Sequence, residues 1–370
     1  MSYRSESEAL DAELLQIIDR WHRTEAVLSE ADFEDLALRM FAYQVRYNAP
    51  YAKYAGSFGY SASHLPKSWH EIPAVPTQAY KEATLATFDV NHAVLTFETS
   101  GTTLGYGGLH YMDTPALYDA TLLAGFDYFM LPDKLRLRYL NVVPNPVLRR
   151  RSSLGYMMAS VSAKRGDENT GWYVRGDEIL TDAFVTDLSD AIQNNRPVCI
   201  ASTAFGLVHI VDAMKDRGLY LPLPSGSRIM ETGGFKGRSR VVERADLYDE
   251  LCERFGCVED DIVAEYGMTE LTSQYYDTTL RDLEEMPGGV RYKQAPPWLR
   301  ARVVAPDGHT LPNGVVGALV HVDLANRSSC VAIQTEDLGV QYERGLVLIG
   351  REQGAALRGC SLDAEELLRR

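Results

Sequence analysis

Hydrophobic positions recur at helical spacing near the start of the chain. Leu10, Leu14 and Ile18 lie four residues apart and would share one face of a helix. We therefore predict helix over residues 5–48. Residues 48–76 are rich in Pro, Ser, Gly and Tyr, a composition typical of irregular structure.

Short apolar runs alternate with amphipathic segments from residue 93 onward. Each run ends in a polar or glycine-bearing turn, as strands followed by helices do. The predicted strands span 93–103, 136–146, 196–203, 227–234 and 261–270, and the predicted helices span 205–218 and 244–256. This alternation indicates an α/β fold with a doubly wound, largely parallel sheet.

The pattern changes after about Met286, where short strands are separated by PDG, PNG and ERG turns. Such turns are typical of a small β-rich subdomain. The predicted division is an N-terminal helical and α/β core over 1–285, a β-rich subdomain over 286–349 and a hinge-like segment over 350–370.

Charge and composition exclude several classes of protein. The 370 residues carry 37 Lys and Arg against 51 Asp and Glu, a formal net charge of -14, so we expect no nucleic-acid partner. No apolar run approaches the roughly 18 residues of a membrane span, and residues 1–16 lack the apolar core of a signal peptide. Five cysteines without a CxxC disfavour a disulfide framework or a zinc site and fit a reducing cytoplasm.

Two glycine-bearing motifs follow predicted strands. Residues 99–103 (TSGTT) combine hydroxyls with a glycine, which suits phosphate oxygens, although such clusters are more often surface turns. Residues 231–237 (ETGGFKG) offer paired glycines against which a flat base fits, and Lys236 as a cation for phosphate or carboxylate. A plain strand-to-helix turn with a solvated lysine is the alternative.

Further motifs place carboxylates at strand ends or turns. Residues 265–270 (EYGMTE) present a ring, a hydroxyl and a carboxylate where open α/β sheets bind ligands, or else a turn capped by Thr269. Residues 335–339 (TEDLG) place an acid that suits a ribose diol or simply closes a hairpin. A GR pair at 350–351 is followed by LRGCSL at 357–362.

The order of these motifs resembles that of the acyl-adenylate-forming ligase superfamily. Within it, the chain resembles the LuxE-type acyl-protein synthetases, the ligase components of bacterial luminescence fatty-acid reductase complexes. YGMTE and LRGCSL are the most specific parts of a resemblance that runs from about residue 40 to the end. It implies the ligase fold, ATP and Mg²⁺ as cofactors, and activation of a carboxylic acid as its acyl-adenylate.

The resemblance also implies roles for individual residues. Tyr266 would stack on adenine, Thr269 would contact the α-phosphate, Glu270 would hold Mg²⁺ and Asp337 would bind the ribose. The residues implied for ATP binding are Thr99, Ser100, Gly101, Thr102, Thr103, Gly233, Gly234, Tyr266, Gly267, Asp337 and Arg351. The implied catalytic residues are Lys236, Thr269, Glu270 and Cys360, and the implied acid-pocket residues are Phe205, Gly206 and His209.

This sequence departs from the superfamily pattern in two ways. The loop after TSGTT lacks the usual Pro-Lys-Gly, so Lys236 or the metal would have to supply that positive charge. The chain stops at Arg370, before the usual C-terminal lid domain with its catalytic lysine, and the usual hinge aspartate position reads Gln353. We therefore expect no lid in this chain.

Cys360 is the expected acyl acceptor. It follows Arg358 and precedes a predicted helix, and both features favour the thiolate. A small buried residue that packs a terminal helix is the alternative. His209 lies on or near the apolar face of its predicted helix, where a core histidine is the more common outcome.

Three functions remain open. The first is activation of a carboxylic acid, by resemblance a fatty acid, with transfer through Cys360 to a partner such as a reductase. The second is a ligase that loads coenzyme A or a carrier protein, with Cys360 merely structural. The third is a nucleotide- or acyl-binding subunit without turnover.

Overall fold

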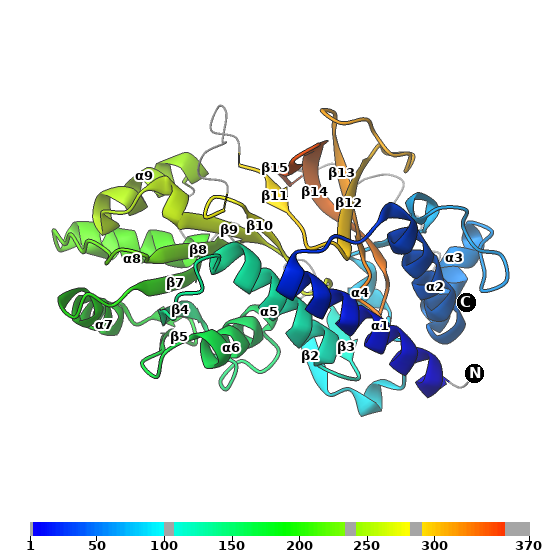
Figure 1. Cartoon of the computed structure of the whole chain (residues 1–370), viewed down its shortest axis with the longest axis horizontal. Coiled ribbons are helices and arrows are strands. Elements are labelled where there is room, and N and C mark those ends of the chain that lie inside the picture. Colours follow the sequence, from blue (N-terminus) through cyan, green and yellow to red (C-terminus); the bar gives the residue numbers. More distant parts are fainter. Residues whose placement is uncertain (1–2, 100–106, 234–241, 282–290, 352–370) are drawn as a thin grey trace. The chain divides into compact units, whose positions relative to one another are not determined.

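The computed structural model describes residues 3–99, 107–233, 242–281 and 291–350 in full, and the backbone of Arg351 (Figure 1). The chain divides into two compact units, which we describe separately. The first comprises residues 1–125, 268–274 and 292–370, and the second comprises 126–267 and 275–291. The expected boundary between residues 285 and 286 lies outside the described residues, so the division made from the sequence stays a prediction.

A mainly parallel sheet forms the centre of the second unit, in the order β10-β9-β8-β7-β4-β5-β6. Five of these strands run parallel, and β6 and β10 pair antiparallel with β5 and β9. Their bounds are β4 (Arg138–Pro144), β5 (Gly171–Arg175), β6 (Glu178–Ile179), β7 (Val198–Thr203), β8 (Arg228–Thr232), β9 (Ile262–Tyr266) and β10 (Tyr275–Asp277). The four strands predicted in this part of the chain are confirmed.

Helices cover both faces of this sheet. Its larger apolar core is formed with α7 (Thr181–Gln193), α8 (Ala204–Asp216) and α9 (Arg244–Phe255) (Figure 1). On the opposite face, α6 (Ser153–Arg165) packs on β4, where the Asn141 amide donates to the Ser162 hydroxyl at 3.1 Å. Residues 198–201 of β7 have no exposed surface, which explains their uninterrupted apolar run. The doubly wound prediction is therefore confirmed.

Helices open the first unit: α1 (Tyr3–Thr24), α2 (Glu30–Tyr47) and α3 (Ala49–Ser57). The helical character predicted over 5–48 is confirmed, and the structure adds a break between α1 and α2. Glu25 has a left-handed φ of 57°, and the Ser29 hydroxyl accepts the Asp32 backbone N–H at 3.1 Å to cap α2. The prediction of irregular structure over 48–76 misses α3, which is capped by Asn48.

The first unit also holds an antiparallel sheet in the order β12-β13-β14-β15-β11, with β1 (Val75–Pro76) parallel to β14. Its other bounds are β11 (Lys293–Gln294), β12 (Leu299–Val304), β13 (Val316–Asp323), β14 (Ala332–Tyr342) and β15 (Gly345–Arg351). The β-rich character predicted for this part of the chain is confirmed.

A separate hairpin joins β2 (Leu95–Glu98) to β3 (Leu109–Met112). The strand predicted over 93–103 therefore forms, but it pairs in this hairpin and lies outside the parallel sheet. The short α4 (Ala79–Glu82) precedes it, and α5 (Ala116–Met130) passes from the first unit into the second. None of the helices in the described parts is both long and apolar enough to cross a membrane.

Candidate active site

Three neighbouring parallel strands of the second unit end at one edge of its sheet. β8 and β9 pair with Thr232 beside Glu265, and the Thr232 hydroxyl donates to the Glu265 carboxylate. Gly233 directly follows the last residue of β8, and Tyr266 is the last residue of β9. Open α/β sheets bind ligands at this edge because the loops after adjacent strands diverge there.

Glycine and ring together make a place for a flat group. Gly233 has φ +73°, a left-handed conformation in which other residues are strained, and no described atom lies within 4 Å of where its Cβ would be. The half-buried Tyr266 ring lies 5.7 Å from that of Tyr275, tilted by 45°. Gly267 follows Tyr266 and is the last residue of the segment 126–267. Gly234 and Lys236 lie outside the described residues.

The third strand end leads directly into α8. The Thr203 hydroxyl accepts the backbone N–H of Gly206 at 3.2 Å and caps this helix. A Cβ at Gly206 would lie 2.4 Å from Ser202 Oγ, so the close approach of helix and strand requires glycine here. Phe205 is half-buried beside it.

His209 is exposed, contrary to the expectation that it lies on or near the apolar face of α8. Residues 207, 208, 210 and 211 occupy the buried face instead. Its role in an acid pocket stays a prediction.

In the first unit, the β2–β3 hairpin holds the two ends of the hydroxyl-rich loop together. Thr99 and Gly108 form two hydrogen bonds across the loop: the Thr99 N–H donates to the Gly108 carbonyl at 2.9 Å, and the Thr99 side-chain hydroxyl accepts the Gly108 N–H at 2.7 Å. A Cβ at Gly107 would lie 2.0 Å from the Thr99 carbonyl oxygen. Ser100, Gly101, Thr102 and Thr103 lie outside the described residues.

The second half of the YGMTE motif forms a turn in the first unit, held from two sides. His110 Nδ1 is 2.7 Å from the Thr269 carbonyl oxygen, and the Asn326 amide donates to the Glu270 carbonyl at 2.9 Å. Glu270 is buried and Thr269 is half-buried. The backbone that carries the hydroxyl and the carboxylate is therefore fixed by buried side chains.

The residues after this turn are anchored by a buried carboxylate. Asp323, with no exposed surface, accepts the backbone N–H groups of Thr272 at 3.0 Å and Ser273 at 2.8 Å. The Ser273 hydroxyl also donates to it at 2.9 Å and accepts the Trp298 indole N–H at 3.0 Å. This network extends the fixed segment from Thr269 to Ser273.

Asp337 lies on β14 opposite Arg351 of β15, next to an irregularity in the pairing of these strands. Asp337 is half-buried, and its charge acts on the fully buried His321 of β13. Burial lowers the pKa of His321 to about 4, although the Asp337 charge opposes this shift. The backbones of the two residues predicted for the ribose side of the site are thus brought together.

Four of the five cysteines lie in the described residues. Cys199 and Cys330 are fully buried, and burial raises the pKa of Cys199 to about 12 and that of Cys330 further still. Cys252 and Cys257 are half-buried near the end of α9 and contact each other through a hydrogen bond. Cys360 lies outside the described residues.

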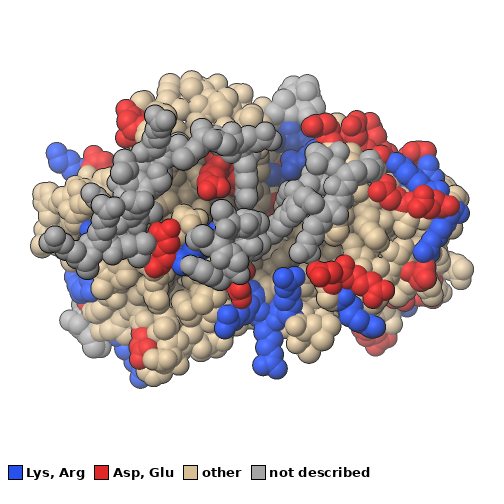
Figure 2. Space-filling view, turned by 180° about the vertical axis from the view of Figure 1, so that it is seen from behind, with Lys and Arg blue, Asp and Glu red and all other residues tan. Residues whose placement is uncertain are grey.

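Charges of both signs are interspersed on the face shown in Figure 2, with no wide basic area among the side chains drawn in colour. An anionic substrate would therefore be bound by local groups: backbone amides, hydroxyls and single cations.

Sequence reasoning missed His110 and Asn326. His110 sits in the run LHYM with nothing to set it apart, and its partner Thr269 lies 159 residues away. Asn326 is 56 residues from Glu270 in a segment without any recognised motif. Only the folded contact identifies either residue.

Comparison with known proteins gives concordant matches. A family model described as "Acyl-protein synthetase, LuxE" matches residues 149–368. The long-chain-fatty-acid–luciferin-component ligase of Vibrio harveyi is 22% identical over 339 residues, which are 88% of this chain and 85% of that protein.

Solved structures agree at the level of the fold. An open conformation of 2-hydroxyisobutyryl-CoA ligase matches with a TM-score of 0.67 and 13% identity, over 89% of this chain and 76% of that one. The phenylalanyl-adenylate complex of McyG A-PCP matches with a TM-score of 0.51 and 20% identity, over 73% of this chain and 49% of that one. The expected ligase fold is confirmed.

Proposed function

Because the chain belongs to the LuxE acyl-protein synthetase family, we propose that it activates a long-chain fatty acid with ATP and passes the acyl group through a thiol to a protein acceptor. Membership makes it a ligase that forms an acyl-adenylate and transfers the acyl group. The name of the Vibrio harveyi relative supports the fatty acid as substrate. A reductase or a carrier protein is the acceptor that we propose.

The observation that carries the proposal is the pair of strand ends at Gly233 and Tyr266. The register that places Thr232 beside Glu265 brings a glycine to the end of one strand and an aromatic residue to the end of the neighbouring strand. A purine fits such a place by stacking on the ring while its edge approaches the backbone. We assign the adenine of ATP to it, with Gly234 and Gly267 beside it.

For residues of the first unit we propose the roles that family resemblance implies. Asp337 would accept the ribose hydroxyls with Arg351 close by, the Thr269 hydroxyl would contact the α-phosphate, and residues 99–103 would bind the β- and γ-phosphates. Glu270 offers one carboxylate, which suits Mg²⁺ because this ion usually takes one or two carboxylates and completes its shell with phosphates and water. Bound there, the ion would neutralise phosphate charge.

Within the described side chains, no group of three or more His, Cys, Asp or Glu could hold a metal alone. The substrate phosphates are thus part of the proposed Mg²⁺ site. Lys236 is the cation we propose for the developing charge, in place of the lysine that the loop after residue 103 lacks.

Formation of the acyl-adenylate and of the thioester takes two steps. A carboxylate oxygen attacks the α-phosphorus, the bond to the bridging oxygen breaks, and pyrophosphate leaves. A thiolate then attacks the acyl carbonyl, and AMP leaves as the thioester forms. The protein contributes mainly position and charge stabilisation to such steps.

We assign the accepting thiol to Cys360. Cys199 and Cys330 are fully buried with raised pKa values, so neither offers an accessible thiolate. Cys252 and Cys257 are half-buried near the end of α9, where they pack against the apolar core of the second unit and hydrogen-bond to each other. Cys360 is the cysteine in the LRGCSL context typical of the family.

Fatty-acid-dependent exchange of labelled pyrophosphate into ATP tests the first step. We expect exchange with long-chain fatty acids and much less with acetate or amino acids. Binding of ATP without exchange for any acid, with or without an acceptor protein, would instead support a non-catalytic subunit. Thioester formation with coenzyme A that survives Cys360→Ser would support a ligase in which Cys360 is structural.

A further inference from the structure

His110 is a buried side chain of β3 with no exposed surface. Its Nδ1 is 2.7 Å from the Thr269 carbonyl oxygen, and its ring packs edge-on against that of Tyr80, with centroids 5.9 Å apart. The hairpin that flanks the hydroxyl-rich loop thus reaches the backbone of the YGMTE motif.

The chemistry of this contact fixes the state of the imidazole. A carbonyl oxygen only accepts hydrogen bonds, so Nδ1 carries the hydrogen and Nε2 keeps its lone pair. Burial lowers the pKa of His110 to about 4, and the ring is therefore neutral near pH 7. The Thr269 carbonyl and the Asn326 side chain both oppose this shift through hydrogen bonding, but burial outweighs them.

Asn326, the other side chain that holds this turn, donates both of its amide hydrogens. The Asn326 amide donates one hydrogen to the Glu270 carbonyl at 2.9 Å and the other to the Cys330 carbonyl at 2.8 Å, and its oxygen accepts from the Thr272 hydroxyl at 3.2 Å. Asn326 therefore has no hydrogen left for the Thr269 carbonyl. His110 is the side chain that donates a hydrogen bond to the Thr269 carbonyl.

We propose that His110 is a positioning residue for acid activation, and that its Nδ1–H fixes the Thr269 carbonyl and thereby the places of the Thr269 hydroxyl and the Glu270 carboxylate. The inference rests on the roles proposed above for these two residues. Successive residues of a tight turn move together, so release of the carbonyl displaces both side chains. Displacements of about 1 Å at such groups reduce rates by up to about 100-fold.

Two amide variants separate the two ring nitrogens. Asparagine places an N–H near the position of Nδ1, whereas glutamine places its amide near that of Nε2. We expect His110→Gln to lower kcat for pyrophosphate exchange by roughly tenfold or more and to raise the Mg²⁺ concentration for half-maximal exchange several-fold. For His110→Asn, both kcat and the Mg²⁺ concentration for half-maximal exchange should stay within about threefold of the wild-type values. His309→Gln is the control, because His309 is 61% exposed in a turn.

Rates are divided by the active fraction, measured as the single-turnover burst of pyrophosphate, so that loss of folded protein does not count. Equal behaviour of the Gln and Asn variants would overturn the inference. The inference would also be overturned if the lower rate of His110→Gln came entirely from a smaller active fraction, with the Mg²⁺ dependence unchanged. Absence of exchange in the wild-type protein would overturn the proposed function itself, and this inference with it.

Discussion

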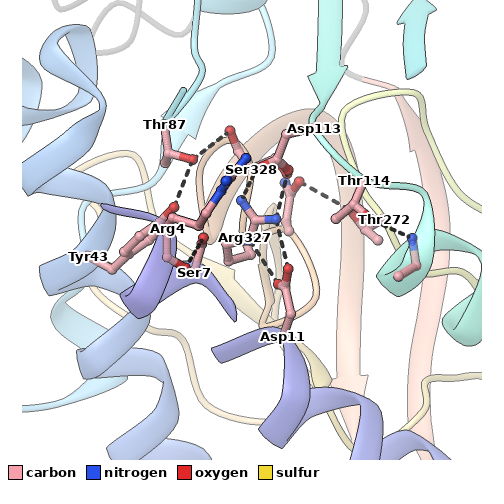
Figure 3. A network of polar contacts seen from close by, with 12 residues as sticks. Arg4, Ser7, Asp11, Tyr43, Thr87, Asp113, Thr114, Thr272, Arg327 and Ser328 are labelled. Atoms are coloured by element: carbon pink, nitrogen blue, oxygen red, sulfur yellow. Dashed lines mark hydrogen bonds and ion pairs between the residues drawn. The ribbon is translucent and has the colours of Figure 1, made fainter. Parts of the chain in front are cut away.

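Replacing Arg327 by methionine removes the cation at the centre of a buried network in the first unit (Figure 3). Arg327 is 1% exposed and forms paired hydrogen bonds to two carboxylates. It donates to Asp11 at 2.8 and 2.9 Å and to Asp113 at 2.9 and 2.7 Å. Asp113 also accepts from the Tyr3 hydroxyl at 2.7 Å. The network joins α1 to the segments after β3 and β13.

The size of the destabilisation depends on the two carboxylates that lose their cation. Burial alone raises the pKa of a carboxyl, and at Asp113 the guanidinium outweighs burial and keeps the pKa below its ordinary value. Without Arg327, two carboxylates that are 16% and 20% exposed face each other. Breaking a buried pair in this way costs about 3–5 kcal/mol. Because both carboxylates keep some contact with water, we expect about 3 kcal/mol from Arg327→Met.

The assay is thermal and urea unfolding followed by circular dichroism. About 3 kcal/mol corresponds to a decrease in Tm of roughly 6–12 °C for domains of 150–250 residues. Arg23→Met is the matched control, since its ion pair with Asp19 is 71% and 52% exposed and should contribute less than about 1 kcal/mol. Adding Asp11→Asn to Arg327→Met should restore part of the stability. The reasoning is refuted if Arg327→Met costs no more than Arg23→Met.

Three further predictions concern pH dependence, packing and nucleotide binding. His321 becomes protonated near pH 6.5 in the unfolded chain but only near pH 4 in the folded chain, so the free energy of unfolding falls as the pH decreases through this window. His321→Gln should remove about 3 kcal/mol of this loss, measured by unfolding at pH 7 and at pH 4. A loss of the same size in the variant would contradict this prediction. Gly108→Ala would place a Cβ 2.8 Å from the Tyr80 backbone and should lower the free energy of unfolding by about 1–3 kcal/mol. Gly56→Ala is the control, because its Cβ meets nothing within 4 Å and should change the free energy of unfolding by less than about 1 kcal/mol. Equal urea midpoints for the two variants would refute the packing argument. Tyr266→Ala should raise KM for ATP roughly tenfold in the exchange assay and Tyr266→Phe should leave it nearly unchanged, while an equal effect of both would remove the stacking role.

Local patterns were sufficient for much of the fold. Residues 198–201 form an uninterrupted apolar run because β7 is buried on both faces, and such a run fits the middle of a parallel sheet. The sequence did not give the position of the break between α1 and α2, because Glu25 carries no strong turn signal although it adopts a left-handed conformation. The pairing of β2 with β3 in a separate hairpin depends on contacts that the composition of residues 93–103 does not specify.

The candidate site could be predicted only where it consists of contiguous motifs. YGMTE and the paired glycines carry their chemistry within a few residues, so the sequence alone suggests Gly233, Tyr266 and Glu270 as site residues, and their roles stay predictions. The contacts that fix these motifs join distant segments, as His110 and Thr269 do across 159 residues. A single sequence holds no signal for such pairs, because the residue types involved are common in any strand or turn.

Intact mass spectrometry of the protein, incubated with MgATP and tetradecanoic acid, tests the central claim most directly. We predict one ATP-dependent acyl adduct per chain, released by neutral hydroxylamine as a thioester should be, present in Cys252→Ser and absent in Cys360→Ser. An acyl adduct that forms without ATP, or persists in Cys360→Ser, would contradict the account.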